Sequence, residues 1–293
     1  MQAAYDRATD VARLAAEVER CAASYQLKLP RTPLSGPAGR TAGADLGSSL
    51  DFQDFRSYFP GDDVRHVDWS VYARSDALVM RLYREEVSPD VEIVLDCSRS
   101  MASTDLKADL TVATTRLFLA LAERQRGTAS IMIAGDEPRR VRRTDVDRVL
   151  SPELFTSTST LAEALLSGRM RFHKRSVRVV VSDFLFPHDP SELVSRLAHG
   201  AAAAYVLQLL EPSELDPDFP GGRLLIDVET DAEANVVVNV DSIARYRSRL
   251  DALSAGLARQ CRLWMTPFAR VAGGSLETTC RDVLLPAGFL EAV

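Results

Sequence analysis

Three oxygen-bearing side chains follow a short apolar run in the first third of the sequence. The run is Val91–Leu95, and Asp96, Ser98 and Ser100 come after it at intervals of two residues. Because alternate residues of an extended chain point the same way, the carboxylate and the two hydroxyls can converge on one point. Hard oxygen donors suit a divalent cation such as Mg²⁺ or Mn²⁺. On spacing alone, the same side chains could instead cap a helix that begins near Ser103.

A second aspartate occupies an equivalent position later in the chain. The apolar run Val177–Val181 ends in Ser182 and Asp183. In a parallel sheet both run ends emerge on the same side, so Asp96 and Asp183 can face one crevice. The hydroxyl-rich segment at 156–165 lies between them in the sequence, and a hydroxyl from it would complete an oxygen-only site.

Strand-like and helix-like segments alternate over most of the chain. The predicted strands lie at 78–86, 91–95, 129–134, 177–181, 203–207 and 262–265, with 139–143 pairing beside 129–134. The predicted helices lie at 4–25, 106–121, 161–166, 191–197 and 243–257. This alternation predicts an α/β fold with a doubly wound, mainly parallel sheet. Residues 211–239 interrupt it and are predicted to form a hairpin at an edge of that sheet.

The segments before the predicted sheet have a different composition. We expect an N-terminal amphipathic helix and linker at 1–48, in which 30–47 is a mobile or irregular connector rich in Pro, Gly, Ser and Thr. The helix could dock on this chain or on a partner. A β-rich extension follows at 49–88, and the main domain occupies 89–293. Within 50–75, aromatic residues alternate with opposite charges, which favours an internal clamp of ion pairs, including His66, over a base-stacking surface.

Composition excludes several classes of protein. The 293 residues carry 35 basic and 41 acidic side chains, a net charge of −6 that argues against a general nucleic-acid binder. Basic stretches at 139–143 and 169–178 could be docking patches, but a solvated rim is favoured. Four scattered cysteines without a CxxC pair indicate reduced thiols in a cytoplasmic protein. The sequence shows no secretory signal, and its longest uncharged run, 197–210, is too short to span a membrane.

The loops around the two aspartates resemble the metal-ion-dependent adhesion site of von Willebrand factor A domains. The resemblance rests on DCSRS at 96–100, the loop TSTST at 156–160 before the LAEAL helix, and the strand-end Asp183. It implies that Ser98 and Ser100 bind Mg²⁺ directly, while Asp96 and Asp183 act largely through water. Ser159 takes the place of the family's usual threonine, with Thr158 and Thr160 as alternatives. The glycine pair usual before that position is absent.

A longer match covers the segment upstream. The string DFQDFRSYFPGDDVRHVDWSVYARSDALVMRLYREE at 51–86, together with DCSRSM at 96–101 and VVVSDFLFP at 179–187, closely resembles the bacterial family called domain of unknown function fifty-eight. Many members carry membrane helices before this signature, so the chain is similar to the soluble branch. The resemblance implies a MoxR-type AAA+ ATPase partner and a role in assembly, maturation or stress tolerance. It implies no established catalytic activity.

The sequence offers no complete catalytic constellation. A haloacid-dehalogenase-like phosphatase needs an aspartate where Ser98 stands, and a phosphatase built on Cys97 needs an arginine where Ser103 stands. No GxSxG elbow or phosphate-binding P-loop is present. The four histidines, His66, His173, His188 and His199, show no ligand spacing. We therefore predict a non-enzymatic module whose metal takes a partner's carboxylate. A metal-dependent hydrolase or phosphoryl-transfer enzyme, or a scaffold without metal, are the alternatives.

Overall fold

The computed structural model describes residues 7–29, 51–60, 62–84, 90–217 and 219–293. The chain divides into two compact units, Met1–Pro30 with Pro89–Val293 and Arg31–Ser88, and each is described by itself. The connector predicted at 30–47 lies outside the described residues.

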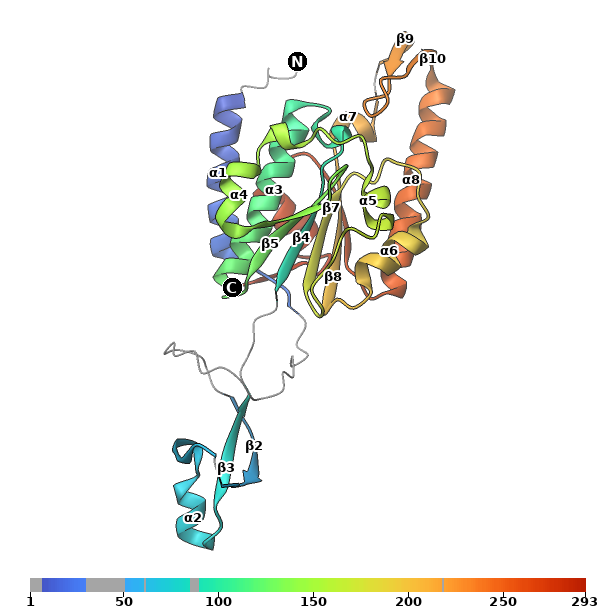
Figure 1. Ribbon diagram of the computed structural model, residues 1–293. Helices are drawn as coiled ribbons and strands as arrows, with labels where there is room; N and C mark the ends of the chain where they lie inside the picture. The colour runs from blue at the N-terminus through green and yellow to red at the C-terminus, as the bar shows by residue number, and fades with distance from the viewer. Residues whose placement is uncertain (1–6, 30–50, 61, 85–89, 218) are drawn as a thin grey trace. The chain divides into compact units, whose positions relative to one another are not determined.

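A six-stranded sheet forms the centre of the larger unit (Figure 1). Its strands, in spatial order, are β11 (Phe268–Ala272), β8 (Ala203–Leu210), β7 (Val177–Ser182), β4 (Val91–Asp96), β5 (Ala129–Ala134) and β6 (Arg139–Arg142). All neighbours are parallel except β6, which runs antiparallel to β5. The predicted α/β fold with a mainly parallel sheet is confirmed, as is the pairing of the segment at 139–143.

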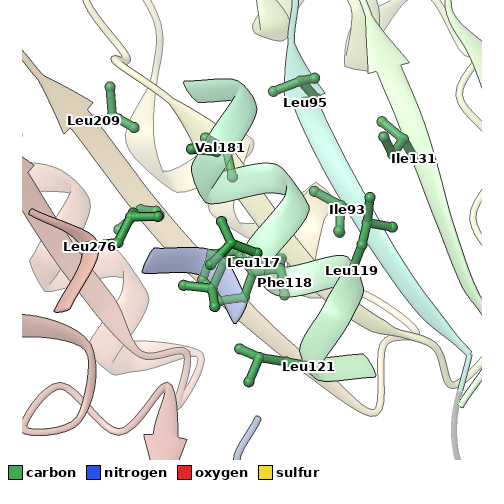
Figure 2. Packing of buried hydrophobic residues seen from close by; sticks show 14 of the residues in the cluster. Ile93, Leu95, Leu117, Phe118, Leu119, Leu121, Ile131, Val181, Leu209 and Leu276 are labelled. Atoms are coloured by element: carbon green, nitrogen blue, oxygen red, sulfur yellow. The ribbon is translucent and has the colours of Figure 1, made fainter. Parts of the chain in front are cut away.

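Helices cover both faces of this sheet. One face carries α1 (Arg7–Ser24), α3 (Asp105–Arg124) and α4 (Val146–Val149), and the other carries α5 (Leu161–Leu166), α6 (Pro190–Ala198) and α8 (Val240–Leu263) (Figure 1). Because side chains alternate across a strand, neighbouring residues of β4 enter different cores. Ile93 and Leu95 belong to the core under α3, whereas Val94 belongs to the core under α6 and α8. Figure 2 shows Leu117 and Phe118 of α3 packed in the first of these cores.

Segments from the N-terminal and C-terminal parts of the chain pack together in the larger unit. The short strands β1 (Tyr25–Leu27) and β12 (Leu290–Ala292) pair antiparallel, and α9 (Leu276–Thr279) and the π-helical turn η5 (Cys280–Leu284) precede β12. Leu14 and Val18 of α1 are buried in the core that α3 shares. The amphipathic N-terminal helix therefore packs on its own chain.

The prediction of a strand at 262–265 is wrong. The helix α8 runs on to Leu263, because Leu250, Leu257 and Cys261 continue its buried stripe. The apolar residues after it do not enter the core, and Met265, at a φ of 51°, is 92% exposed. The last strand of the central sheet begins three residues later, at Phe268. Short apolar runs of this kind do not distinguish a helix end from a strand.

Residues 211–239 form a hairpin, as predicted, but not at an edge of the central sheet. After α7 (Pro212–Leu215), the strands β9 (Gly221–Ile226) and β10 (Glu233–Val238) pair only with each other. Most of their side chains are exposed. The hairpin extends from the same end of the sheet as α7 (Figure 1).

The smaller unit contains β2 (Asp51–Ser57) paired antiparallel with β3 (Val79–Arg84), the single turn η1 (Val64–His66) and α2 (Trp69–Ser75). Arg56 binds both carboxylate oxygens of Asp62 at 2.7 Å, and Asp68 caps α2 by accepting from two backbone N–H groups. Ion pairs therefore stabilise this segment, although Phe59 and Trp69 are exposed rather than enclosed. The predicted contribution of His66 lies outside the described side chains.

The described helices include none that is both long and apolar enough to cross a membrane. In the stretch at 197–210, the first two residues end α6, a short turn follows, and the rest forms the buried strand β8.

Candidate metal centre

The first part of the candidate site is the turn that follows β4. Asp96 is fully buried, and its Oδ1 accepts a 3.0 Å hydrogen bond from the Ser98 N–H. The hydroxyls of Ser98 and Ser100 share a hydrogen bond of 3.0 Å. Neither serine caps α3, whose N-cap is Thr104 with a hydroxyl that accepts from the Lys107 N–H. Ser98 precedes the single 3-10 turn Arg99–Ala102, but its side chain makes no capping hydrogen bond there. The structure thus brings together the three side chains that the spacing singled out.

The second part is the end of β7, the parallel neighbour of β4. Ser182 donates its hydroxyl to Asp96 Oδ2 at 2.6 Å and thereby ties the two strand ends together. Asp183 is also fully buried, and its Oδ1 accepts from the Leu185 N–H at 3.0 Å. The two aspartates therefore lie at adjacent strand ends, as the parallel arrangement predicted.

A buried lysine that sequence reasoning missed joins this group. Lys107, fully enclosed in the first turn of α3, donates from Nζ to Asp183 Oδ2 at 2.9 Å and to Glu214 Oε1 at 2.6 Å. In the structure Lys107, Thr111 and Thr115 form one buried stripe of the helix, but their polar side chains give no sign of burial in the sequence.

The site contains more negative than positive charge. Burial and the charge of Asp183 raise the pKa of Asp96 to about 7, against the hydrogen bonds from Ser182 and Ser98. Burial opposes the charge on Lys107, but Asp183 and Glu214 outweigh it and raise the pKa of the ammonium. Burial likewise raises the pKa of Glu214. When all are ionised, three carboxylates face one ammonium, which leaves two negative charges uncompensated.

The third part of the candidate site is the loop at 156–160, called the third loop below, which contacts the β4 turn through its backbone. Ser157 pairs with Ser98 in a parallel bridge, and its hydroxyl accepts from the Asp136 N–H at 2.9 Å. Asp136, which the sequence analysis did not single out, accepts from the Ser159 N–H at 2.9 Å. Hydrogen bonds from Ser159 lower the pKa of Asp136 to about 2. This carboxylate fixes the loop that carries the predicted third ligand.

The three candidates in that loop are not equivalent. Thr160 is the N-cap of α5, and its hydroxyl both accepts from the Glu163 N–H and donates to the Glu163 carboxylate. Thr158 is exposed, and its hydroxyl donates a hydrogen bond of 3.4 Å to Asp136 Oδ1. The capping role of Thr160 leaves Ser159 and Thr158 as the hydroxyls that this loop can offer.

The arrangement fits a divalent cation in two respects. Neighbouring oxygens around an octahedral Mg²⁺ lie about 2.9 Å apart, and the Ser98 and Ser100 hydroxyls are separated by 3.0 Å. The uncompensated negative charge would also be relieved by two positive charges. Among the described residues no three Asp, Glu, His or Cys side chains form a metal cage, so hydroxyls and water would have to supply most ligands.

Cys97 lies between these residues but faces elsewhere. It is buried, its Sγ contacts the Leu95 carbonyl oxygen at 3.6 Å, and burial raises the pKa of its thiol well above the usual value. A protonated, enclosed thiol is a poor nucleophile. Cys97 is therefore a small core residue, in agreement with its alternation away from the serines.

A comparison with known protein families found a match for this chain. Residues 54–256, more than half of the sequence, match the family described as "Protein of unknown function DUF58". The chain belongs to the DUF58 family. The matched region includes both aspartates, both serines of the β4 turn and the third loop. No curated protein matches the sequence.

Two solved structures resemble this DUF58 protein at a distance. The conserved hypothetical protein BatB from Bacteroides thetaiotaomicron is 14% identical, with a TM-score of 0.38 over 66% of this chain and 95% of that one. An aerotolerance-related membrane protein from Bacteroides fragilis NCTC 9343 is 16% identical, with a TM-score of 0.30 over 58% and 99% of the two chains. Neither likeness is close enough to assign a function.

Proposed function

We propose that this DUF58 protein is a non-enzymatic interaction module, with a von Willebrand factor A-like domain, that binds a protein partner through Mg²⁺ or Mn²⁺. The observation that carries the proposal is the pair of serine hydroxyls 3.0 Å apart beside two buried aspartates. Ser98 and Ser100 would hold the ion directly, Asp96 and Asp183 through water, and Ser159 from the third loop.

The chemistry of these ligands favours binding a carboxylate. Neutral hydroxyls next to the ion leave much of its charge uncompensated, so an aspartate or glutamate of the partner is a strong additional ligand. The buried aspartates hold the ion without neutralising it by direct contact. Both aspartates are fully buried.

The proposed partner is a MoxR-type AAA+ ATPase, and the proposed setting is the cytoplasm. The partner is inferred from the family resemblance of the 51–101 signature, together with a role in assembly, maturation or stress tolerance. The setting is supported by the four cysteines, all buried and unpaired by disulfides.

Metal binding is tested by titrating Mn²⁺ into the purified protein and following free Mn²⁺ by electron paramagnetic resonance. We expect one site in the wild type, competed by Mg²⁺, and its loss in Ser100→Ala. Ser248→Ala, on the exposed face of α8, is the matched control and should bind like the wild type. Equal binding by both variants would refute the assignment of the serines.

Partner binding is tested by capture of the cognate ATPase with and without chelator. We expect capture that EDTA abolishes and that Ser100→Ala lacks. Hydrolysis of a phosphoester such as p-nitrophenyl phosphate by the wild type, lost in Asp183→Asn, would instead establish the enzymatic alternative.

A further inference from the structure

The tip of the β9–β10 hairpin returns to the candidate metal centre. Glu229 accepts the Ser100 N–H on Oε1 at 2.9 Å and the Arg99 N–H on Oε2 at 3.3 Å. The Arg99 guanidinium in turn binds Asp231 at 3.0 Å and the Val228 carbonyl oxygen at 3.4 Å. Four contacts therefore join the turn after β4 to a tip about 130 residues later in the chain.

Two carboxylates of the tip contact the turn after β4: Glu229 accepts from its backbone N–H groups, and Asp231 pairs with the Arg99 guanidinium. Asp227 Oδ1 accepts from the N–H groups of Glu229 and Thr230, both at 2.9 Å, which closes a turn within the tip itself. Most of the surrounding hairpin is exposed, whereas Glu229 is half-buried. The hairpin strands pair only with each other, and the contacts of Glu229 and Arg99 join the tip to the turn after β4.

We propose that Glu229 is an internal carboxylate ligand, which occupies the coordination position that a partner's carboxylate would take. This inference rests on the proposed function, because it requires a cation held by Ser98 and Ser100. The Glu229 carboxylate is hydrogen-bonded to the peptide N–H of Ser100, the residue whose hydroxyl is one proposed ligand. A partner carboxylate must then displace Glu229, and the hairpin tip leaves with it.

An internal ligand changes how the site selects partners. A tethered carboxylate competes at an effective concentration that reaches the millimolar range for short links. A single acidic side chain of a passing protein, or free acetate, cannot displace it at lower concentrations. A partner that also contacts the exposed hairpin can do so, because it moves the tether as it supplies the new ligand.

The test uses the full-length protein, Mn²⁺ alone and two hairpin variants. Glu229→Gln removes the proposed ligand, and Glu233→Gln removes the same charge from an exposed position of the same hairpin. Because each charged ligand strengthens binding of a hard cation, we expect Glu229→Gln to weaken Mn²⁺ on the order of tenfold. Water-proton relaxation should show one additional Mn²⁺-bound water in that variant. Glu233→Gln should match the wild type in both measurements.

Hydrogen exchange separates a ligand from a simple tether. In the wild type, Mn²⁺ should slow exchange of the amides at 227–231, and Glu229→Gln should abolish this dependence on the ion. If the wild type binds Mn²⁺ but Glu229→Gln leaves both the affinity and the water number unchanged, the inference fails and the proposed metal site stands. If the wild type binds no Mn²⁺, the proposed function and the inference fail together.

Discussion

Replacing Lys107 by methionine isolates the electrostatics of the site. The substitution keeps most of the side-chain volume and removes the ammonium that contacts Asp183 and Glu214 at 2.9 and 2.6 Å. The Asp183 side chain is fully buried, whereas the Glu214 side chain is 19% exposed and is partly hydrated. Most of the cost therefore falls on Asp183.

The expected loss in the free energy of unfolding is about 3–5 kcal/mol, the usual cost of breaking a buried ion pair by removing one partner. That is a large part of a typical stability of roughly 5–15 kcal/mol. A divalent cation should reduce the deficit, because the variant no longer repels it with an ammonium. At a concentration about one hundred times the dissociation constant, a bound ion adds about 2.7 kcal/mol.

Urea unfolding followed by circular dichroism, with EDTA or with Mg²⁺, measures both effects. Lys174→Met is the matched control, because Lys174 is exposed, and it should change stability by less than about 0.5 kcal/mol. If Lys107→Met does not fold, Lys107→Met combined with Asp183→Asn should restore folding, since the fully buried charge of Asp183 is then removed together with its partner. A loss below about 1 kcal/mol in EDTA, or equal stabilisation of wild type and variant by Mg²⁺, would show that the reasoning is wrong.

Three further predictions concern the same domain. The raised pKa of Asp96 favours its protonated form in the folded state, so its contribution to stability is complete below pH 4 and is lost as the pH rises through about 7. Without metal, the free energy of unfolding of the wild type should fall by up to about 4 kcal/mol relative to that of Asp96→Asn between these pH values. Mg²⁺ should reduce this dependence on pH. A Cβ on Gly135 would lie 2.9 Å from Ser157 Cβ, so Gly135→Ala should cost about 1–3 kcal/mol in thermal unfolding and weaken Mn²⁺, whereas Gly222→Ala, in open space, should do neither. Leu117→Ala should cost about 2–5 kcal/mol in urea unfolding without changing Mn²⁺ affinity in the folded protein, because Leu117 is fully buried in the core under α3.

The fold was readable from the sequence wherever local pattern and burial agree. The runs at 91–95 and 177–181 are enclosed on both faces, so their continuous apolar character identified them as parallel strands. The error at 262–265 arose where the pattern is ambiguous. Cys261 continues the buried stripe of α8, and the apolar residues after it are exposed, which no local periodicity reveals.

Some residues of the candidate site could be predicted from the sequence, and others could not. Asp96, Ser98, Ser100 and Asp183 were identifiable because a strand and the turn after it place them, and strand ends of a parallel sheet meet by topology. Glu229 and Asp136 act through contacts with backbone N–H groups of distant loops, and the sequence around them carries no motif for such contacts. Lys107 belongs with Glu229 and Asp136, because its burial and its two carboxylate partners come from segments distant in the sequence.

The difference between the residues at strand ends and those on distant loops has a physical consequence for how the site would work. The groups that the sequence reveals are fixed by the central sheet, and their geometry cannot change without disturbing the core. Glu229, the proposed ligand, comes from a hairpin whose described strands pair only with each other, so we expect it to leave at little cost to the central sheet. A metal held on one side by buried strand ends and on the other by a detachable carboxylate combines a rigid site with a replaceable ligand. In such a site, partner exchange requires no rearrangement of the sheet.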